Sequence, residues 1–285
     1  MIAIIFLLIV IDFTGHTKCT IHADDAISIS EYSVPYIIIE VKYFSDDTLF
    51  VWTVSGYLEK WSGNGFIRVS DTLYDTHLTE RVLLRVAPKT KRISMQDIAA
   101  SGLSEYWDKV INRPRLPAGR YRINILYGIS ENQPPDKKWD DLVHIEKELN
   151  VYEVSETCRS AINDIRELFM SNSRDTLMQR YFSHIDNISD CAAEYYFLAI
   201  RRAWLAAERN SSEANNFMRR VGSDVIRKIP ESYAAVFFLR NMNIAEKIET
   251  NNIEFSRERV ERNRFIDSLG ERNVLRRVSK NERTE

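Results

Sequence analysis

The chain has 285 residues, of which 44% are hydrophobic, enough material for about two globular domains. Its 39 Lys and Arg nearly balance its 41 Asp and Glu, and a formal net charge of −2 gives no electrostatic basis for binding nucleic acid or an anionic membrane surface. Glycine and proline are scarce, with 9 and 7 residues, which argues against collagen-like sequence and long flexible linkers.

An apolar run at the N-terminus indicates export. Residues 2–11 have the length of a signal-peptide core, and a helix that crosses a bilayer needs about 20 apolar residues. A polar stretch follows, and we expect cleavage near Ala23, so that residues 1–23 are a signal peptide. The alternatives are an uncleaved anchor, a lipid on Cys19, or a buried first strand of a cytosolic domain. No later segment has bilayer length without charges, so we expect a secreted or periplasmic chain with no membrane span after processing.

Two cysteines, Cys158 and Cys191, follow the expected signal peptide. Cysteines in an exported chain are usually paired. We expect them to begin the first and third helices of the second half, and short connections make sequential helices antiparallel, so both starts lie at one end. The sequence therefore predicts a disulfide between them. The alternatives are two reduced buried thiols, or a thiol site with His184, which needs a base and an orienting group that sequence does not reveal.

The first half, residues 24–155, is predicted to be an antiparallel β-sandwich. Its pattern has period two and is rich in β-branched and aromatic residues. Asn64-Gly65 is typical of a tight hairpin, and residues 94–110 are expected to be helical or irregular. Side chains expected to share a face are Phe50, Trp52 and Val54 on one strand and Tyr121, Ile123 and Ile125 on another. The predicted strands are residues 36–43, 49–54, 57–61, 66–69, 81–86, 120–127 and 144–154.

Two segments of this half resemble a known family. Residues 116–123, Leu-Pro-Ala-Gly-Arg-Tyr-Arg-Ile, resemble the start of a late, tyrosine-containing strand in immunoglobulin-like and fibronectin-like domains. Residues 39–47 are similar to the first hairpin of many exported immunoglobulin-like domains. The resemblance implies an immunoglobulin-like sandwich without the antibody disulfide, because this half has no cysteine. It implies no function, since such domains have many roles.

The second half, residues 156–285, is predicted to be an α-helical domain, which makes the chain an α+β two-domain protein. Apolar residues recur with helical spacing, and Ile162, Ile165, Leu168 and Phe169 form the first stripe. Pro230 is expected at the first turn of a helix. The tail from residue 252 alternates Arg and Glu and predicts a solvated helix that frays after Gly270. The other predicted helices are residues 174–185, 191–208, 211–228 and 231–248.

Two clusters are candidate sites. Trp61 and Trp139, if exposed, form an aromatic platform for sugar or peptide, although sandwich cores also use tryptophan routinely. Lys137 and Lys138 lie beside Trp139 in the longest polar loop of this half. Metal ligands are suggested by Asp75 and His77, because residues two apart on a strand share a face. The alternative for that pair is a polar loop between strands.

No P-loop, nucleophile elbow, zinc cysteine pair or dinucleotide fingerprint is present, so no catalytic residue and no cofactor is assigned. Asn187 and Asn210 lie in glycosylation sequons. The sequence favours an exported non-enzymatic binding or adaptor protein with a protein or glycan partner. The alternatives are an envelope hydrolase with a site in the cleft between the halves, and a structural subunit of an envelope assembly. Inward carboxylates in that cleft favour the hydrolase; an apolar groove or an open strand edge favours binding.

Overall fold

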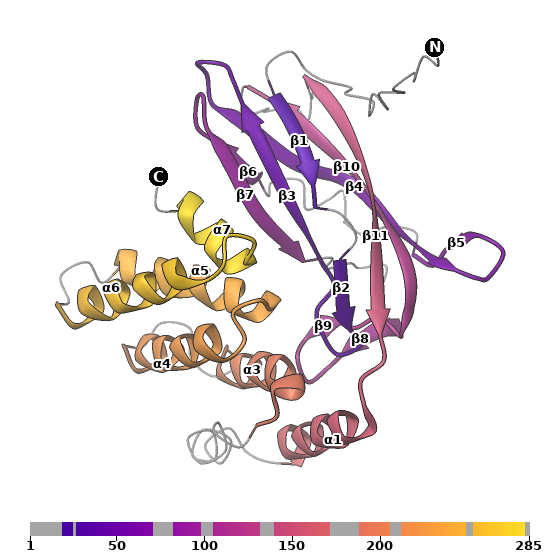
Figure 1. The fold of residues 1–285 in the computed structure, drawn as a ribbon, viewed down its shortest axis with the longest axis vertical. Helices are drawn as coiled ribbons and strands as arrows, with labels where there is room; N and C mark the ends of the chain where they lie inside the picture. The colour runs from indigo at the N-terminus through magenta and orange to yellow at the C-terminus, as the bar shows by residue number, and fades with distance from the viewer. Residues whose placement is uncertain are drawn as a thin grey trace, which may run out of the picture.

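The structure is a computed structural model that describes residues 19–24, 27–70, 82–97, 105–131, 140–171, 188–205, 212–248 and 253–282. Its first half consists of β-strands and its second half of α-helices, six of which lie within the described residues (Figure 1). The expected boundary near residue 155 falls between the last strand and the first helix. Within the described residues, no helix is both long and apolar enough to cross a membrane.

A three-stranded antiparallel sheet has the order β1-β3-β7, with β1 at Cys19–Ala23, β3 at Tyr36–Tyr43 and β7 at Lys91–Asp97. The central strand β3 is buried on both faces, because Ile37 and Ile39 point to one side and Ile38 to the other. The prediction that residues 94–110 are helical or irregular is wrong for residues 94–97. They belong to β7, where pairing with β3 overrides a weak local pattern.

A six-stranded sheet has the order β2-β11-β10-β4-β5, with β6 also paired to β4. Its strands are β2 (Ile27–Ser30), β4 (Leu49–Trp61), β5 (Phe66–Arg68), β6 (Val82–Val86), β10 (Gly119–Ser130) and β11 (Asp141–Tyr152). A separate short hairpin pairs β8 (Trp107–Asp108) with β9 (Arg113–Pro114). The predicted inward face of β10 is confirmed, since Tyr121, Ile123 and Ile125 are all fully buried.

Strand β4 is longer than the sequence predicts. It is continuous, where the sequence suggests a break between residues 54 and 57, because β10 pairs with it along nearly its whole length. Phe50 and Trp52 lie on one face as expected, since their ring centroids are 5.6 Å apart. Leu49, Val51 and Trp52 are buried, while Phe50 and Val54 are half-buried. The strand has a register shift between Val51 and Trp52 against β6.

The helices lie together beside the sheets, with α5 and α7 next to the three-stranded sheet and α1 and α3 below the strand ends (Figure 1). They are α1 (Glu156–Ser171), α3 (Asp190–Leu205), α4 (Ser212–Lys228), α5 (Tyr233–Ile248), α6 (Ile253–Ser268) and α7 (Val274–Glu282). Helices α5 and α7 contact β7. Buried side chains from both halves, such as Ile38 and Met95 in strands and Leu275 and Val278 in α7, belong to one hydrophobic cluster. The core is therefore continuous from sheet to helices, and independent folding of the two halves remains a prediction.

Two details of the helical half differ from prediction. Helix α5 begins at Tyr233, so Pro230 lies before the helix and not in its first turn. The Ser232 hydroxyl caps the start of α5 by accepting a hydrogen bond from the Ala235 amide at 3.1 Å. The chain does not fray after Gly270, because α7 buries Leu275 and Val278 completely. The predicted helix 174–185 lies outside the described residues.

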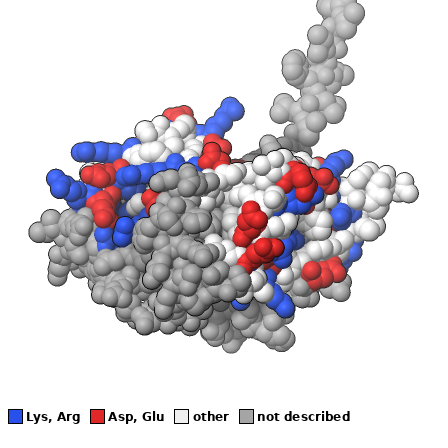
Figure 2. Space-filling model, turned by 90° about the horizontal axis from the view of Figure 1, so that it is seen from below, with Lys and Arg blue, Asp and Glu red and all other residues white. Residues whose placement is uncertain are grey.

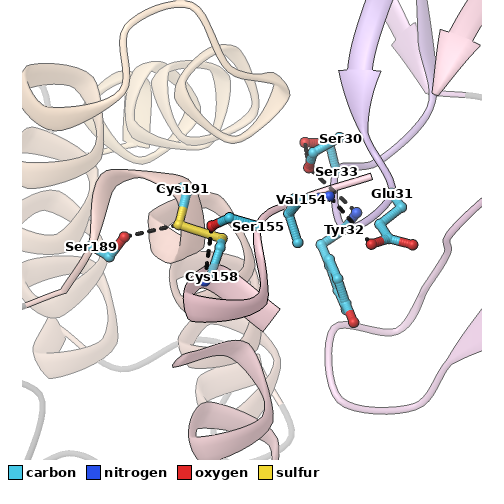
Figure 3. Close-up of a disulfide and its surroundings, with 9 residues drawn as sticks. All are labelled: Ser30, Glu31, Tyr32, Ser33, Val154, Ser155, Cys158, Ser189 and Cys191. Atoms are coloured by element: carbon cyan, nitrogen blue, oxygen red, sulfur yellow. Dashed lines mark hydrogen bonds between the residues drawn. A yellow bond between two sulfur atoms is a disulfide. The ribbon is translucent and has the colours of Figure 1, made fainter. Parts of the chain in front are cut away.

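Cys158 and Cys191 form a disulfide, as the sequence predicts (Figure 3). Their Cα atoms are 6.1 Å apart, and each cysteine lies in the first turn of its helix, Cys158 in α1 and Cys191 in α3. The Ser155 hydroxyl accepts a hydrogen bond from the Cys158 amide at 3.3 Å and so caps α1. The bridge joins two helices that also pack against each other.

Candidate functional site

The boundary between the two halves is filled by side chains that bind one another. Figure 3 shows Glu31, from the turn after β2, beside the backbone of Val154 that leads into α1; the Val154 amide donates to Glu31 Oε1 at 3.4 Å. Further contacts connect strands to helices at separate points: the Asp24 carboxylate with Arg277 of α7 at 2.5 and 2.9 Å, Glu31 with Arg159 of α1 at 3.1 Å, and the Met95 carbonyl with Arg240 of α5 at 3.1 Å.

A buried carboxylate, Asp108 of β8, also connects the two halves. It accepts hydrogen bonds from the Tyr195 hydroxyl of α3 at 3.0 Å and from the Val110 amide at 2.8 Å, and it forms an ion pair with Arg115 at 2.8 Å. The Arg115 guanidinium lies over the Tyr32 ring, 4.5 Å from its centroid. Burial, then the charge of Asp108, raises the pKa of the Tyr195 hydroxyl, which keeps this group a donor. Two hydrogen bonds and one ion pair engage Asp108, so it holds strands to helices.

A second carboxylate, Glu194 of α3, lies at the start of α5. Its Oε1 accepts a hydrogen bond from the Ala234 amide at 3.3 Å. Burial raises the pKa of this carboxyl, although hydrogen bonds from Ser33, Ala234 and Tyr233 oppose the shift. A carboxyl at a helix N-terminus is a capping group. The carboxylates described at the boundary therefore have structural partners.

A cavity of about 340 Å³ lies between α4 and α6. Four arginines, three acids and two apolar side chains are among its lining residues. The Arg219 guanidinium is buried there and binds Glu258 at 2.7 and 3.1 Å. Charges of both signs also lie close together on the described part of the face in Figure 2. The lining of this cavity does not select a ligand class by charge.

The predicted metal ligands, Asp75 and His77, lie outside the described residues, and so do Trp139, Lys137, Lys138 and the sequons at Asn187 and Asn210. Within the part of the chain that is described, no group of three or more His, Cys, Asp or Glu side chains is arranged to hold a metal. The remaining predicted site residue is Trp61, which is 39% exposed at the end of β4.

Trp61 belongs to a surface of alternating rings and guanidinium groups on the outer face of the six-stranded sheet. We call it the aromatic–arginine face and define it as Tyr57, Trp61, Phe66, Arg68, Arg120 and Arg122. The Trp61 and Phe66 rings meet edge to face with centroids 5.3 Å apart. Each ring has a guanidinium over it: Arg120 over Trp61 at 5.5 Å, Arg122 over Phe66 at 4.5 Å, and Arg68 over Tyr57 at 4.4 Å.

Strand alternation places these side chains together. Residues two apart share a face of a strand, so Tyr57 and Trp61 of β4 lie beside Arg120 and Arg122 of β10. The hairpin from β4 to β5 aligns Trp61 with Phe66. Its loop takes positive φ at Gly63 (94°) and Gly65 (156°). The loop spans residues 62–65, as the predicted flanking strands imply, and its positive φ values fall on the two glycines and not on Asn64, at positions where other residues are strained.

Carboxylates hold the guanidinium groups in place. Arg122 Nε binds Glu59 at 2.5 Å and Arg122 Nη1 binds Glu146 at 3.2 Å, while Arg120 binds Glu148 at 3.2 Å. The hydrogen bond to Glu59 raises the pKa of the Arg122 guanidinium. Surface ion pairs of this kind contribute only about 0–1 kcal/mol to stability. Their consequence here is geometric, because carboxylates of neighbouring strands position Arg120 over Trp61 and Arg122 over Phe66.

The tip of the hairpin exposes one more apolar residue. Ile67 of β5 is 55% exposed and points to the opposite side of the hairpin from Phe66 and Arg68. The sequence indicates Trp61 but not Phe66, Ile67 or the arginines. The Arg-Tyr-Arg alternation at residues 120–122 is a signal for the arginines, because it places both on the outer face of an otherwise apolar strand.

Comparison with known proteins gives only distant likenesses. No protein-family model matches the chain, and no curated protein matches it. Among solved structures, a PapD-like domain of human CEP192 aligns with a TM-score of 0.28 and 9% identity, covering 49% of this chain and 87% of that one. The CsuC–CsuE chaperone–tip adhesion subunit complex of Acinetobacter baumannii aligns with a TM-score of 0.25 and 10% identity, covering 50% and 64%.

A family 123 glycoside hydrolase from Clostridium perfringens aligns with a TM-score of 0.31 and 8% identity. This chain is covered over 64% of its length and the hydrolase over 36%. TM-scores this low support no argument about function.

Proposed function

We propose that the chain is an exported, non-enzymatic binding protein that contacts a protein partner through the aromatic–arginine face and the β4–β5 hairpin. The observation that carries the proposal is this face, where three rings and three guanidinium groups lie in fixed pairs on the outside of the sheet. Trp, Tyr and Arg are the residue types most enriched among the energetically dominant positions of protein interfaces.

A protein partner fits this surface better than a glycan. Guanidinium groups already cover the rings of Trp61 and Phe66, which leaves less flat aromatic area for stacking a sugar. On the other side of the hairpin, the exposed aliphatic side chain of Ile67 offers an apolar contact that a protein enclosing the hairpin can bury. The β4–β5 hairpin also extends beyond the rest of the sheet, within reach of a partner surface (Figure 1).

Export is supported by the disulfide, because such bonds persist in oxidising compartments outside the cytoplasm. We further propose that the two sheets are an immunoglobulin-like sandwich and that residues 156–285 form a second domain. The hydrolase alternative has little support at the boundary between the halves. Asp24, Glu31, Asp108 and Glu194 each bind a cation or an N–H group there.

The test is affinity purification of the tagged chain from its native envelope or medium, with quantitative mass spectrometry of co-purified proteins. Ile67→Asp and Trp61→Ala alter the proposed surface, and Val260→Asp, at an exposed position on α6, is the matched control. Truncating a dominant interface residue costs about 2 kcal/mol, roughly 30-fold in affinity. We expect one protein to be retained by the native chain and by Val260→Asp and to be lost from the other two. Equal recovery with all variants, or enrichment of carbohydrate alone, contradicts the proposal.

A further inference from the structure

Strand β1 is an integral part of the sheet, although it lies where the sequence predicts the end of a signal peptide. Its five residues pair with β3, from Cys19 opposite Tyr43 to Ala23 opposite Ile39. Cys19 is 4% exposed and Ala23 is 1% exposed, and both point to the inner side of the sheet. The Asp24 amide extends the pairing by donating to the Ile38 carbonyl at 3.0 Å.

Removal of β1 leaves the sheet incomplete. The order β1-β3-β7 makes β3 the central strand, with β1 on one side and β7 on the other. Without β1, β3 becomes an edge strand with unpaired N–H and C=O groups along Ile39–Tyr43, which is a site for aggregation. The inner side chains Ile39 and Val41, which are fully buried, also lose the cover that Cys19 and Ala23 provide.

The residue after β1 is bound to the helices. The Asp24 carboxylate forms a two-bond ion pair with Arg277 of α7, at 2.5 and 2.9 Å. Cleavage directly after Ala23 converts the Asp24 amide into a charged ammonium group near the Arg277 guanidinium. Cleavage also removes β1, the strand that precedes Asp24 and holds it in position. Cleavage at this site therefore weakens a contact between the two halves as well as the sheet.

We propose that the export leader is removed on the N-terminal side of Cys19, so that β1 remains in the processed protein. This inference rests on the proposed export, and it moves the processing site upstream of the position near Ala23 that the sequence suggests. It also adds a third cysteine to the processed chain, beside the Cys158–Cys191 disulfide.

The surroundings of Cys19 explain how a free thiol persists in an oxidising compartment. The side chain is buried on the inner side of the sheet, with no room for a lipid on its sulfur. Burial, together with the charge of Asp141, raises the pKa of the thiol to about 11. Because the thiolate is the reactive form, Cys19 reacts slowly with oxidants and alkylating agents while the protein is folded.

The test is carried out on the native chain purified from outside the cytoplasm. Its N-terminus is sequenced, and its intact mass is measured after treatment with iodoacetamide without reductant, first folded and then in denaturant. We expect a chain that begins at or before Cys19, with no label when folded and one label when unfolded. An exported chain that begins at Asp24 or later, with no label in denaturant, overturns the inference and leaves export intact.

Other outcomes also decide the question. A chain that begins at Cys19 and carries the mass of a lipid overturns the inference. A cytoplasmic chain with intact Met1 overturns both the inference and the proposed export. A second measurement compares purified chains that begin at residue 18 and at residue 25. We expect the shorter chain to melt at least about 5 °C lower, and equal melting temperatures contradict a structural role for β1.

Discussion

Removal of one hydroxyl group tests whether the sheets and helices form a single cooperative unit. In the variant Tyr195→Phe, the ring keeps its edge-to-face contact with Tyr32, 6.0 Å between centroids, but the hydrogen bond to Asp108 is lost. Among the described residues, the partners that buried Asp108 retains are the Val110 amide and Arg115. A hydrogen bond to a charged group contributes about 1.5–3 kcal/mol. We therefore expect a loss of roughly 2 kcal/mol in the free energy of unfolding.

The assay is urea denaturation followed by tryptophan fluorescence and by far-ultraviolet circular dichroism. Four of the five tryptophans lie in the first half, so fluorescence reports mainly on the sheets and circular dichroism mainly on the helices. We expect both transitions to shift together, whereas the exposed control Tyr152→Phe changes stability by less than about 0.5 kcal/mol. A shift as small as that of the control, or a shift in the circular dichroism transition alone, would refute the reasoning.

Three further changes have expected outcomes. Replacing Cys158 and Cys191 together by serine should lower the free energy of unfolding, measured in guanidinium, by about 3–4 kcal/mol, because the bridge closes a loop over a sequence separation of 33. An unchanged free energy of unfolding would contradict a native disulfide. Glu194→Gln should become more stable relative to the native chain as the pH rises above about 4.3, the ordinary pKa of a glutamate in the unfolded chain. The pKa of Glu194 is raised in the folded protein, so ionisation of this carboxyl destabilises the folded state above that pH. Parallel plots of stability against pH for the two proteins contradict this. Gly63→Ala should lower the melting temperature, because φ is 94° at that position. Gly270→Ala is the control, since that glycine lies in open space and has no positive φ, and it should leave the melting temperature unchanged. Equal effects of the two substitutions argue against strain in the hairpin loop.

Local patterns in the sequence predict much of this fold. Strands β3 and β10 were found because their alternating or continuous apolar residues are buried against the neighbouring strands. The change of period near residue 155 marks the start of α1. The disulfide followed from the cysteine count and from helix order, both of which are read from the chain alone.

Features that depend on distant contacts were not predictable. Residues 19–30 carry a weak pattern, and their strands exist because β3 and β11 offer partners for pairing. The segment after Gly270 appears polar in sequence, but α7 is ordered by burial of Leu275 and Val278. The Asp108–Tyr195 hydrogen bond joins residues 87 positions apart, and no spacing rule relates them.

The candidate site was predicted only at Trp61. The exposure of Trp61 and the position of Arg120 over its ring depend on the register between β4 and β10, which a sequence does not specify uniquely. Phe66 joins it through the hairpin, and Arg122 is positioned by Glu59 from another strand. A surface built from three strands becomes visible only after the strands have been paired.

The most direct test of the proposed binding surface is photo-crosslinking in the native organism. A photoreactive amino acid replaces Trp61 in one strain and Met170, which is exposed on α1, in a control strain. Both chains are exposed to light in intact cells, purified, and examined for adducts by gel electrophoresis and mass spectrometry. We expect a single protein adduct from position 61 and none from position 170. Adducts from position 170 with none from position 61 would contradict the assignment of the aromatic–arginine face as the binding surface.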